Sequence, residues 1–103
     1  DIHTPTTKPI VTILGVGSVT YRPSDKITVS LSTNSVYPIV RADYFFNGVF
    51  IGSSTNAPFS FSFAPQNTTS LESEYNTIKV NVYDSVQNQS SSEALVTIIN
   101  GGQ

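Results

Sequence analysis

The chain has 103 residues, which suits one domain with its own core. Five Lys and Arg against seven Asp and Glu leave a net charge of −2, so the chain lacks the basic face that nucleic-acid binding needs. Without cysteine it offers neither a thiol nucleophile nor a Cys-ligated zinc site, and no apolar run reaches the length of a membrane span. We therefore expect a polar domain that binds no nucleic acid and does not insert into a membrane.

Residues 1–8 (DIHTPTTK) contain Thr and Pro without an apolar pattern, which predicts an extended linker. Because the chain begins at Asp1 rather than at Met, we interpret it as a fragment or a processed product, and expect it to be one module of a longer polypeptide. The first strand is predicted at Ile10–Leu14. Glycines then interrupt it, and residues 19–21 are expected to resume the strand at a sheet edge. Residues 26–33 alternate apolar and polar side chains, which predicts a strand with one wet face.

The stretch VRADYFFNGVFIGSSTNAPFSFSF, residues 40–63, predicts a hairpin followed by a third strand. Its turn is Asn47-Gly48, since both central residues of a type I′ turn need positive φ. Such a turn pairs Phe46 with Val49, Phe45 with Phe50, and Tyr44 with Ile51. The expected buried face carries Ala42, Tyr44, Phe46, Val49 and Ile51, and the outer face carries Arg41, Asp43, Phe45 and Phe50.

Three Phe residues alternate with Ser in the third strand of this stretch, which indicates a core-facing side. The polar connection at 64–74 is expected to cross from one sheet to the other. Strands are predicted at 77–83 and 93–99, with a turn at 84–89 between them, and residues 101–103 form a tail. About seven strands with turn residues between them follow, which is the pattern of an all-β sandwich of two sheets over residues 9–100, expected to be a monomer. The predicted core comprises Val11, Ile13, Ile27, Val29, Leu31, Ala42, Tyr44, Phe46, Ile51, Phe59, Phe61, Phe63, Ile78, Val80, Val82, Val96 and Ile98.

Three segments resemble bacterial immunoglobulin-like domains. The hairpin stretch is similar to the family's central strand, Asn/Asp-Gly turn, Ile-Gly pair and Ala-Pro-Tyr/Phe-Ser-Phe block. TIKVNVYDSVQNQSSSEALVTI resembles its closing hairpin, and KPIVTI with YRPSDKITVSLS resembles its opening strands. The chain departs from the pattern at Val86-Gln87-Asn88, where the family usually has Ala-Gly-Asn, and in a longer crossing loop.

The resemblance implies that the sandwich is an immunoglobulin-like β-sandwich. It also implies a non-catalytic accessory or spacer module of an exported bacterial protein, at the cell surface or secreted. Such domains accompany glycoside hydrolases, cell-wall synthases of the penicillin-binding type, and adhesins. Neighbouring domains of the same polypeptide are then the expected partners. Fold alone does not assign a function, so the parent protein stays open at this point.

From the available side chains we expect neither catalytic activity nor a bound cofactor. The only histidine is His3, which lies in the predicted linker, so no Ser-His-acid triad can form on the folded body. Calcium prefers several oxygen ligands from one loop, and the weak candidates are Asp84, Glu72 and Glu74. The alternative for Asp84 is a bond to the backbone amides of its own turn. Asn67-Thr68-Thr69 and Asn88-Gln89-Ser90 match the glycosylation pattern, and in a bacterial protein we interpret both matches as chance.

A binding function is the second hypothesis. Phe45 and Phe50 on the outer face, with Arg41, Asp43 and Tyr83 nearby, would form a surface for carbohydrate or cell-wall peptidoglycan. Two plainer accounts compete with it: a cross-strand pair that stiffens the hairpin, and packing against a neighbouring domain. Exposure of both rings distinguishes the hypotheses, because buried rings cannot bind a ligand.

Overall fold

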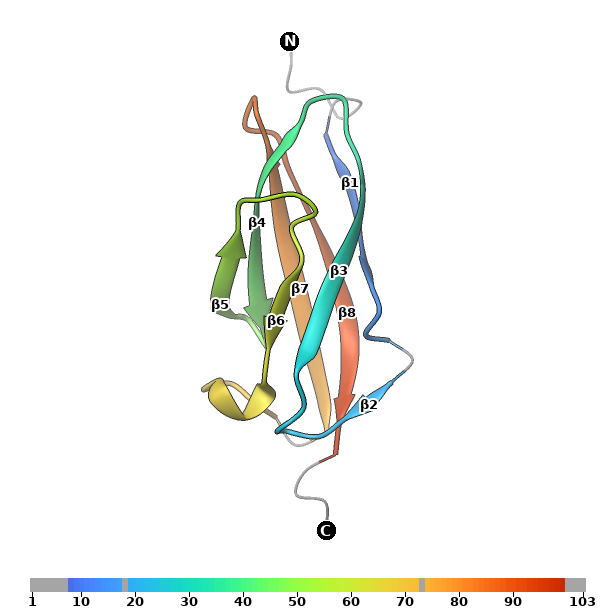
Figure 1. Cartoon of the computed structure of the whole chain (residues 1–103), viewed down its shortest axis with the longest axis vertical. Coiled ribbons are helices and arrows are strands. Elements are labelled where there is room, and N and C mark those ends of the chain that lie inside the picture. Colours follow the sequence, from blue (N-terminus) through green and yellow to red (C-terminus); the bar gives the residue numbers. More distant parts are fainter. Residues whose placement is uncertain (1–7, 18, 73, 100–103) are drawn as a thin grey trace.

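The computed structural model describes residues 8–17, 19–72 and 74–99, which form an immunoglobulin-like β-sandwich (Figure 1). The three-stranded sheet has the order β1-β3-β6, with β1 at Ile10–Leu14, β3 at Ile27–Asn34 and β6 at Phe61–Phe63. The five-stranded sheet has the order β2-β8-β7-β4-β5, with β2 at Thr20–Tyr21, β8 at Gln89–Ile98, β7 at Tyr75–Asp84, β4 at Ile39–Phe46 and β5 at Val49–Ser54. Among the described residues, no helix is long and apolar enough to cross a membrane.

The chain passes from one sheet to the other between β1 and β2. β1 pairs antiparallel with β3, whereas β2 pairs parallel with β8 in the other sheet. The expected resumption at residues 19–21 is therefore real, but it belongs to the opposite sheet. Between the two strands Val16 is only 1% exposed, and the sequence reasoning did not place it in the core. Its burial follows from the crossing, because the connecting chain passes over the end of the core.

The hairpin forms as a type I′ turn predicts for its first pairs and then departs from it. Asn47 and Gly48 have φ of 51° and 85°, and Phe46 pairs with Val49. The register then shifts: Tyr44 pairs with Gly52 rather than with Ile51, so Ile51 forms a β-bulge. The predicted pairing of Tyr44 with Ile51 is thus wrong.

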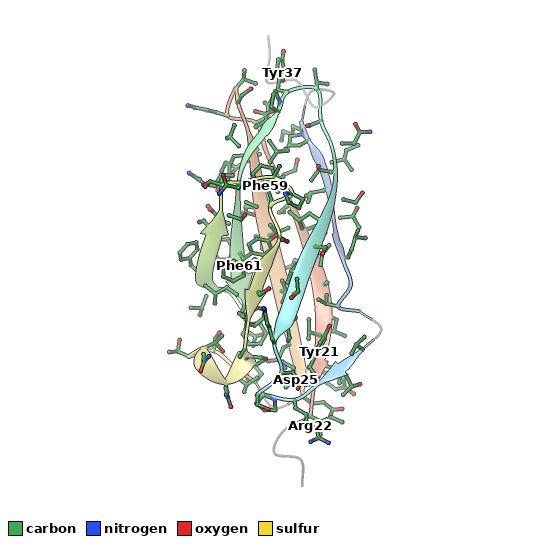
Figure 2. All side chains as sticks on the ribbon, in the orientation of Figure 1. Tyr21, Arg22, Asp25, Tyr37, Phe59 and Phe61 are labelled. Atoms are coloured by element: carbon green, nitrogen blue, oxygen red, sulfur yellow. The ribbon has the colours of Figure 1, made fainter. Side chains whose placement is uncertain are left out.

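The Phe61 ring of β6, labelled in Figure 2, lies close to β5 at the bulge. It stacks on Tyr44 with ring centroids 5.0 Å apart, and a Cβ at Gly52 would lie 2.5 Å from its edge. Only a residue without a side chain fits opposite Tyr44, and the bulge brings Gly52 to that position. Val49, assigned to the buried face, is 44% exposed at the turn end of β5. That assignment is also wrong, because β5 is an edge strand.

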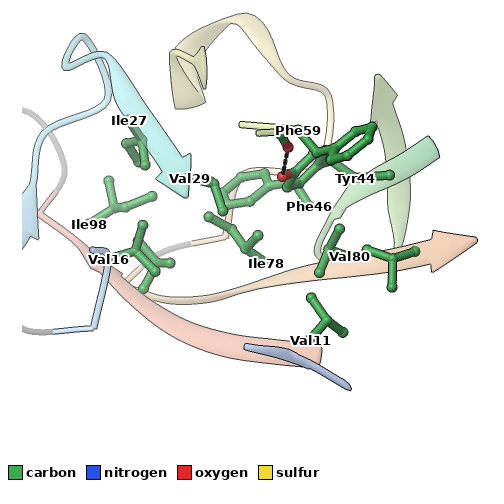
Figure 3. Packing of buried hydrophobic residues seen from close by; sticks show 13 residues of the cluster. Val11, Val16, Ile27, Val29, Tyr44, Phe46, Phe59, Ile78, Val80 and Ile98 are labelled. Atoms are coloured by element: carbon green, nitrogen blue, oxygen red, sulfur yellow. Dashed lines mark hydrogen bonds between the residues drawn. The ribbon is translucent and has the colours of Figure 1, made fainter. Parts of the chain in front are cut away.

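The core lies between the sheets and is built by the alternating inward residues of β3, β4, β7 and β8 (Figure 3). The side chains at 78, 80 and 82 are 0% exposed, as the alternation predicts. Phe59 is 9% exposed but precedes β6 with a φ of 65°, so the predicted Phe-Ser-Phe-Ser-Phe strand is shortened to Phe61–Phe63. Predicted core residues that pack at the margin of the buried cluster, partly exposed, are Ile13, Leu31, Ile51, Phe61 and Phe63.

The connection from β6 to β7 crosses between the sheets as expected, and it contains a 3-10 turn at Pro65–Asn67. β8 begins at Gln89 rather than at 93, so the turn before it is shorter than predicted. The described chain enters near one end of an elongated body at β1 and leaves β8 at the opposite end (Figure 1). The predicted linker at 1–8, apart from Lys8, and the predicted tail at 101–103 lie outside the described residues.

Candidate functional site

The outer face of the five-stranded sheet carries the five residues singled out as binding candidates. Arg41 of β4 lies opposite Tyr83 of β7, and its guanidinium carbon is 4.1 Å from the centre of the Tyr83 ring. The Arg41 Nε atom is 3.1 Å from Asp43 Oδ1, and the Ser53 hydroxyl donates to the same oxygen at 2.6 Å. Such partly exposed pairs contribute about 1 kcal/mol each. The charged and aromatic groups here are thus engaged with one another.

Phe45 and Phe50 are cross-strand partners on this face. Their ring centroids are 5.8 Å apart at an interplanar angle of 68°, an edge-to-face arrangement. Phe50 is 56% exposed, whereas Phe45 is partly buried. The pair therefore leaves one ring open to a ligand, and it also supports the plainer account of a pair that stiffens the hairpin.

The carboxylates considered for calcium lie at opposite ends of β7. Asp84 ends the strand, and its Oδ1 accepts from the amides of Val86 at 3.0 Å and Asn88 at 2.8 Å. Glu72 and Glu74 precede the strand, roughly 30 Å away for ten residues in extended conformation. The three acids do not meet, and Asp84 shapes its own turn. The part of the chain that the structure describes contains no cluster of three His, Cys, Asp or Glu residues suited to a metal ion.

Tyr44 is the phenol whose protonation differs most from its ordinary behaviour. It is 0% exposed, and its hydroxyl donates to the backbone carbonyl of Phe59 (Figure 3). Burial raises the pKa of Tyr44 to about 12, because a phenolate would lose its hydration. The group is closed off in the core, so it acts structurally rather than as a proton donor to a ligand.

A groove of about 450 Å³ lies where the edges of β5 and β6 meet the 3-10 turn. Its lining includes Val49, Phe50, Phe61, Phe63, Asn67 and Thr69. Sequence reasoning missed this groove, because its residues come from three separate segments of the chain. In addition, Phe61 and Phe63 were predicted to be core residues. A second hollow of about 370 Å³ lies beside Arg41 and Tyr83.

Comparison with solved structures gives a fold match. A structure from "Structures of Clostridium thermocellum CbhA fibronectin(III)-like modules" aligns with a TM-score of 0.68 and 17% sequence identity, over 89% of this chain and 99% of that one. No family model matches the chain, and no curated protein matches it. At this identity the match concerns the fold alone: an immunoglobulin-like β-sandwich of the kind seen in a bacterial fibronectin(III)-like module.

Proposed function

We propose that the chain is a non-catalytic accessory module of a larger exported bacterial cell-envelope protein. It would space, orient or dock neighbouring domains of the same polypeptide. The observation that carries this proposal is the path of the chain, which enters at one end of the long sandwich and leaves at the other (Figure 1). A module of this shape separates whatever precedes it from whatever follows it.

The interior supports a rigid spacer. β7 and β8 pair over most of their ten residues each, which is roughly 30 Å of continuous ladder. Both faces of the core contribute fully buried side chains, and each buried Val or Ile stabilises the fold by about 1.5–3 kcal/mol relative to exposure. The match to a fibronectin(III)-like module is consistent with an accessory role.

Replacement in the parent polypeptide tests the proposal. Residues 9–100 would be deleted in one version and exchanged in another for an unrelated β-sandwich whose ends are equally far apart. For a spacer, deletion lowers the activity of the neighbouring domain and the exchange restores it. For a docking module, the exchange fails and substitutions on one face reproduce the loss. Full activity after deletion would refute both roles.

Direct binding of carbohydrate or peptidoglycan through Phe45 and Phe50 is the second candidate, and the 56% exposure of Phe50 favours it. The test is retention of the purified chain on insoluble polysaccharides and peptidoglycan sacculi. Retention that Phe45→Ala and Phe50→Ala each abolish, with folding intact, would establish a binding module. Equal retention of the variants would exclude this aromatic face.

A further inference from the structure

The groove between β5 and β6 is lined by aromatic and aliphatic residues. Phe50 and Val49 of β5 border it and are 56% and 44% exposed, and Phe61 and Phe63 of β6 line it and are partly exposed. Its volume of about 450 Å³ falls within the roughly 300–1,000 Å³ of small-molecule sites. We propose that this groove, which we call the edge groove, binds a neutral saccharide. The proposal goes beyond the spacer role and does not rest on it. It shares Phe50 with the second candidate function but places the ligand at the β5–β6 edge, where Asn67 lies, instead of on Phe45.

The rim of the edge groove offers unused hydrogen-bonding groups. Within the part of the chain that the structure describes, the Asn67 side-chain amide has no hydrogen-bond partner, and neither does the Thr69 hydroxyl. An amide presents two donors and one acceptor, which matches a pair of adjacent sugar hydroxyls. A saccharide ring has an apolar C–H face and a hydroxyl-bearing edge, so Phe50 can pack against the face while Asn67 bonds to the edge.

The charge of the groove decides between neutral and ionic ligands. The residues that line it are all uncharged, so a carboxylate or phosphate bound there would lose hydration without gaining a counter-charge. The outer face differs, because Arg41 and Asp43 are present there but are paired with each other. A neutral glycan therefore fits the edge groove better than an anionic one does.

An extended peptide, the other occupant of such a position, is disfavoured by the strand edges themselves. Strand addition needs a regular edge with free N–H and C=O groups. β5 is bulged at Ile51, and β6 is three residues long with Pro58 and Pro65 near its ends. Bulges, short strands and prolines are the features that prevent edge pairing. The same features disfavour a second copy of the chain pairing edge to edge.

Binding to the whole chain labelled with nitrogen-15 tests the proposal. The neutral probes are cellohexaose, xylohexaose and mannohexaose; the charged probe is hexagalacturonate, and the peptide probe is a capped hexapeptide of alternating Val and Thr. We expect at least one neutral probe to shift the amide signals of Phe50, Asn67 and Thr69. Phe50→Ala and Asn67→Ala should each weaken that binding about tenfold or more. The matched control is Tyr83→Ala, an aromatic on the outer face, which should leave the dissociation constant unchanged.

Four outcomes would overturn the proposal. These are shifts confined to the outer face around Arg41 and Tyr83, binding of hexagalacturonate alone, binding of the peptide alone, and no shift with any probe at millimolar concentration. If the amide spectrum of Phe50→Ala shows loss of the fold, Phe50→Leu replaces it. Leucine keeps an apolar side chain but removes the flat ring, so it should also weaken binding. None of these outcomes affects the domain-exchange test of the spacer role, so the two proposals fail separately.

Discussion

The turn of the central hairpin is joined to the crossing loop by a buried amide network centred on Asn76. Asn76 is 0% exposed, and its Oδ1 accepts from Asn47 Nδ2 at 2.8 Å and from the Glu72 amide at 2.8 Å. Its own Nδ2 donates to the Glu74 carbonyl at 3.1 Å. Asn47 in turn donates to the Ser70 carbonyl at 2.7 Å. Two asparagines therefore hold the loop that connects the sheets.

Replacement of Asn76 by alanine should be strongly destabilising. It removes three hydrogen bonds, each with a net contribution of about 1 kcal/mol, so we expect a loss of about 3 kcal/mol. That loss is a large fraction of the roughly 5–15 kcal/mol that stabilises a typical domain. Asn47→Gly keeps a residue that accepts positive φ and removes only the side-chain bonds. The double variant then isolates the direct bond, with a coupling energy of about 1 kcal/mol.

Urea unfolding, followed by far-ultraviolet circular dichroism and tyrosine fluorescence, measures these free energies, because the chain has no tryptophan. The matched control is Asn81→Ala, on the same strand but facing outward, which should change stability by about 0.5 kcal/mol or less. A loss below about 1 kcal/mol for Asn76→Ala, or additive effects in the cycle, would refute the reasoning.

Three further changes test single contacts by urea unfolding. Gly52→Ala should destabilise by about 1–3 kcal/mol, because the new Cβ would lie 2.5 Å from the Phe61 ring; an unchanged midpoint would contradict this. Tyr44→Phe should cost about 1–2 kcal/mol at neutral pH, since it leaves the carbonyl of Phe59 unpaired. The pKa of Tyr44 is raised to about 12, so the wild type keeps its extra free energy of unfolding below pH 10 and loses it as the pH rises toward 12. The difference in unfolding free energy between wild type and variant should therefore narrow by up to about 1.4 kcal/mol per pH unit. A difference that stays constant from pH 9 to 11.5 would speak against this reasoning. Gln87→Gly should stabilise by about 0.5–1 kcal/mol, because Gln87 has a φ of 70°; a lower midpoint would show that its side chain contributes there.

Alternation along a strand predicts well which side chains face the core. In β7 and β3 every second residue was expected inward, and Ile27, Val29, Ile78 and Val80 are all 0% exposed. Each of these strands pairs with a neighbouring strand on both sides, so its geometry is regular over many residues. Where a strand pairs regularly with its neighbours, the alternation of apolar and polar residues in the sequence predicts which of its faces is buried.

The features that could not be predicted depend on contacts between distant segments. The turn sequence determines the first pairs of the hairpin, but the bulge at Ile51 depends on the Phe61 ring, which belongs to the other sheet. Val16 lies between two glycines and belongs to no alternating apolar pattern. It is buried only because the chain changes sheet at this point. The Asn76 network joins residues 29 positions apart, and local propensity carries no trace of it.

The same distinction separates the two candidate surfaces. Periodicity places Arg41, Asp43 and Tyr83 on one face, yet it does not say whether they face a ligand or one another. In the structure they satisfy one another, so a ligand on that face must first displace an ion pair and a ring contact. In the edge groove no ion pair has to be displaced, because its lining is uncharged. Within the described residues the Asn67 side chain has no hydrogen-bond partner, and the Phe50 ring, although it contacts Phe45, is 56% exposed. Binding energy is the surplus over what is displaced, and on that ground a neutral ligand gains more in the edge groove than on the outer face.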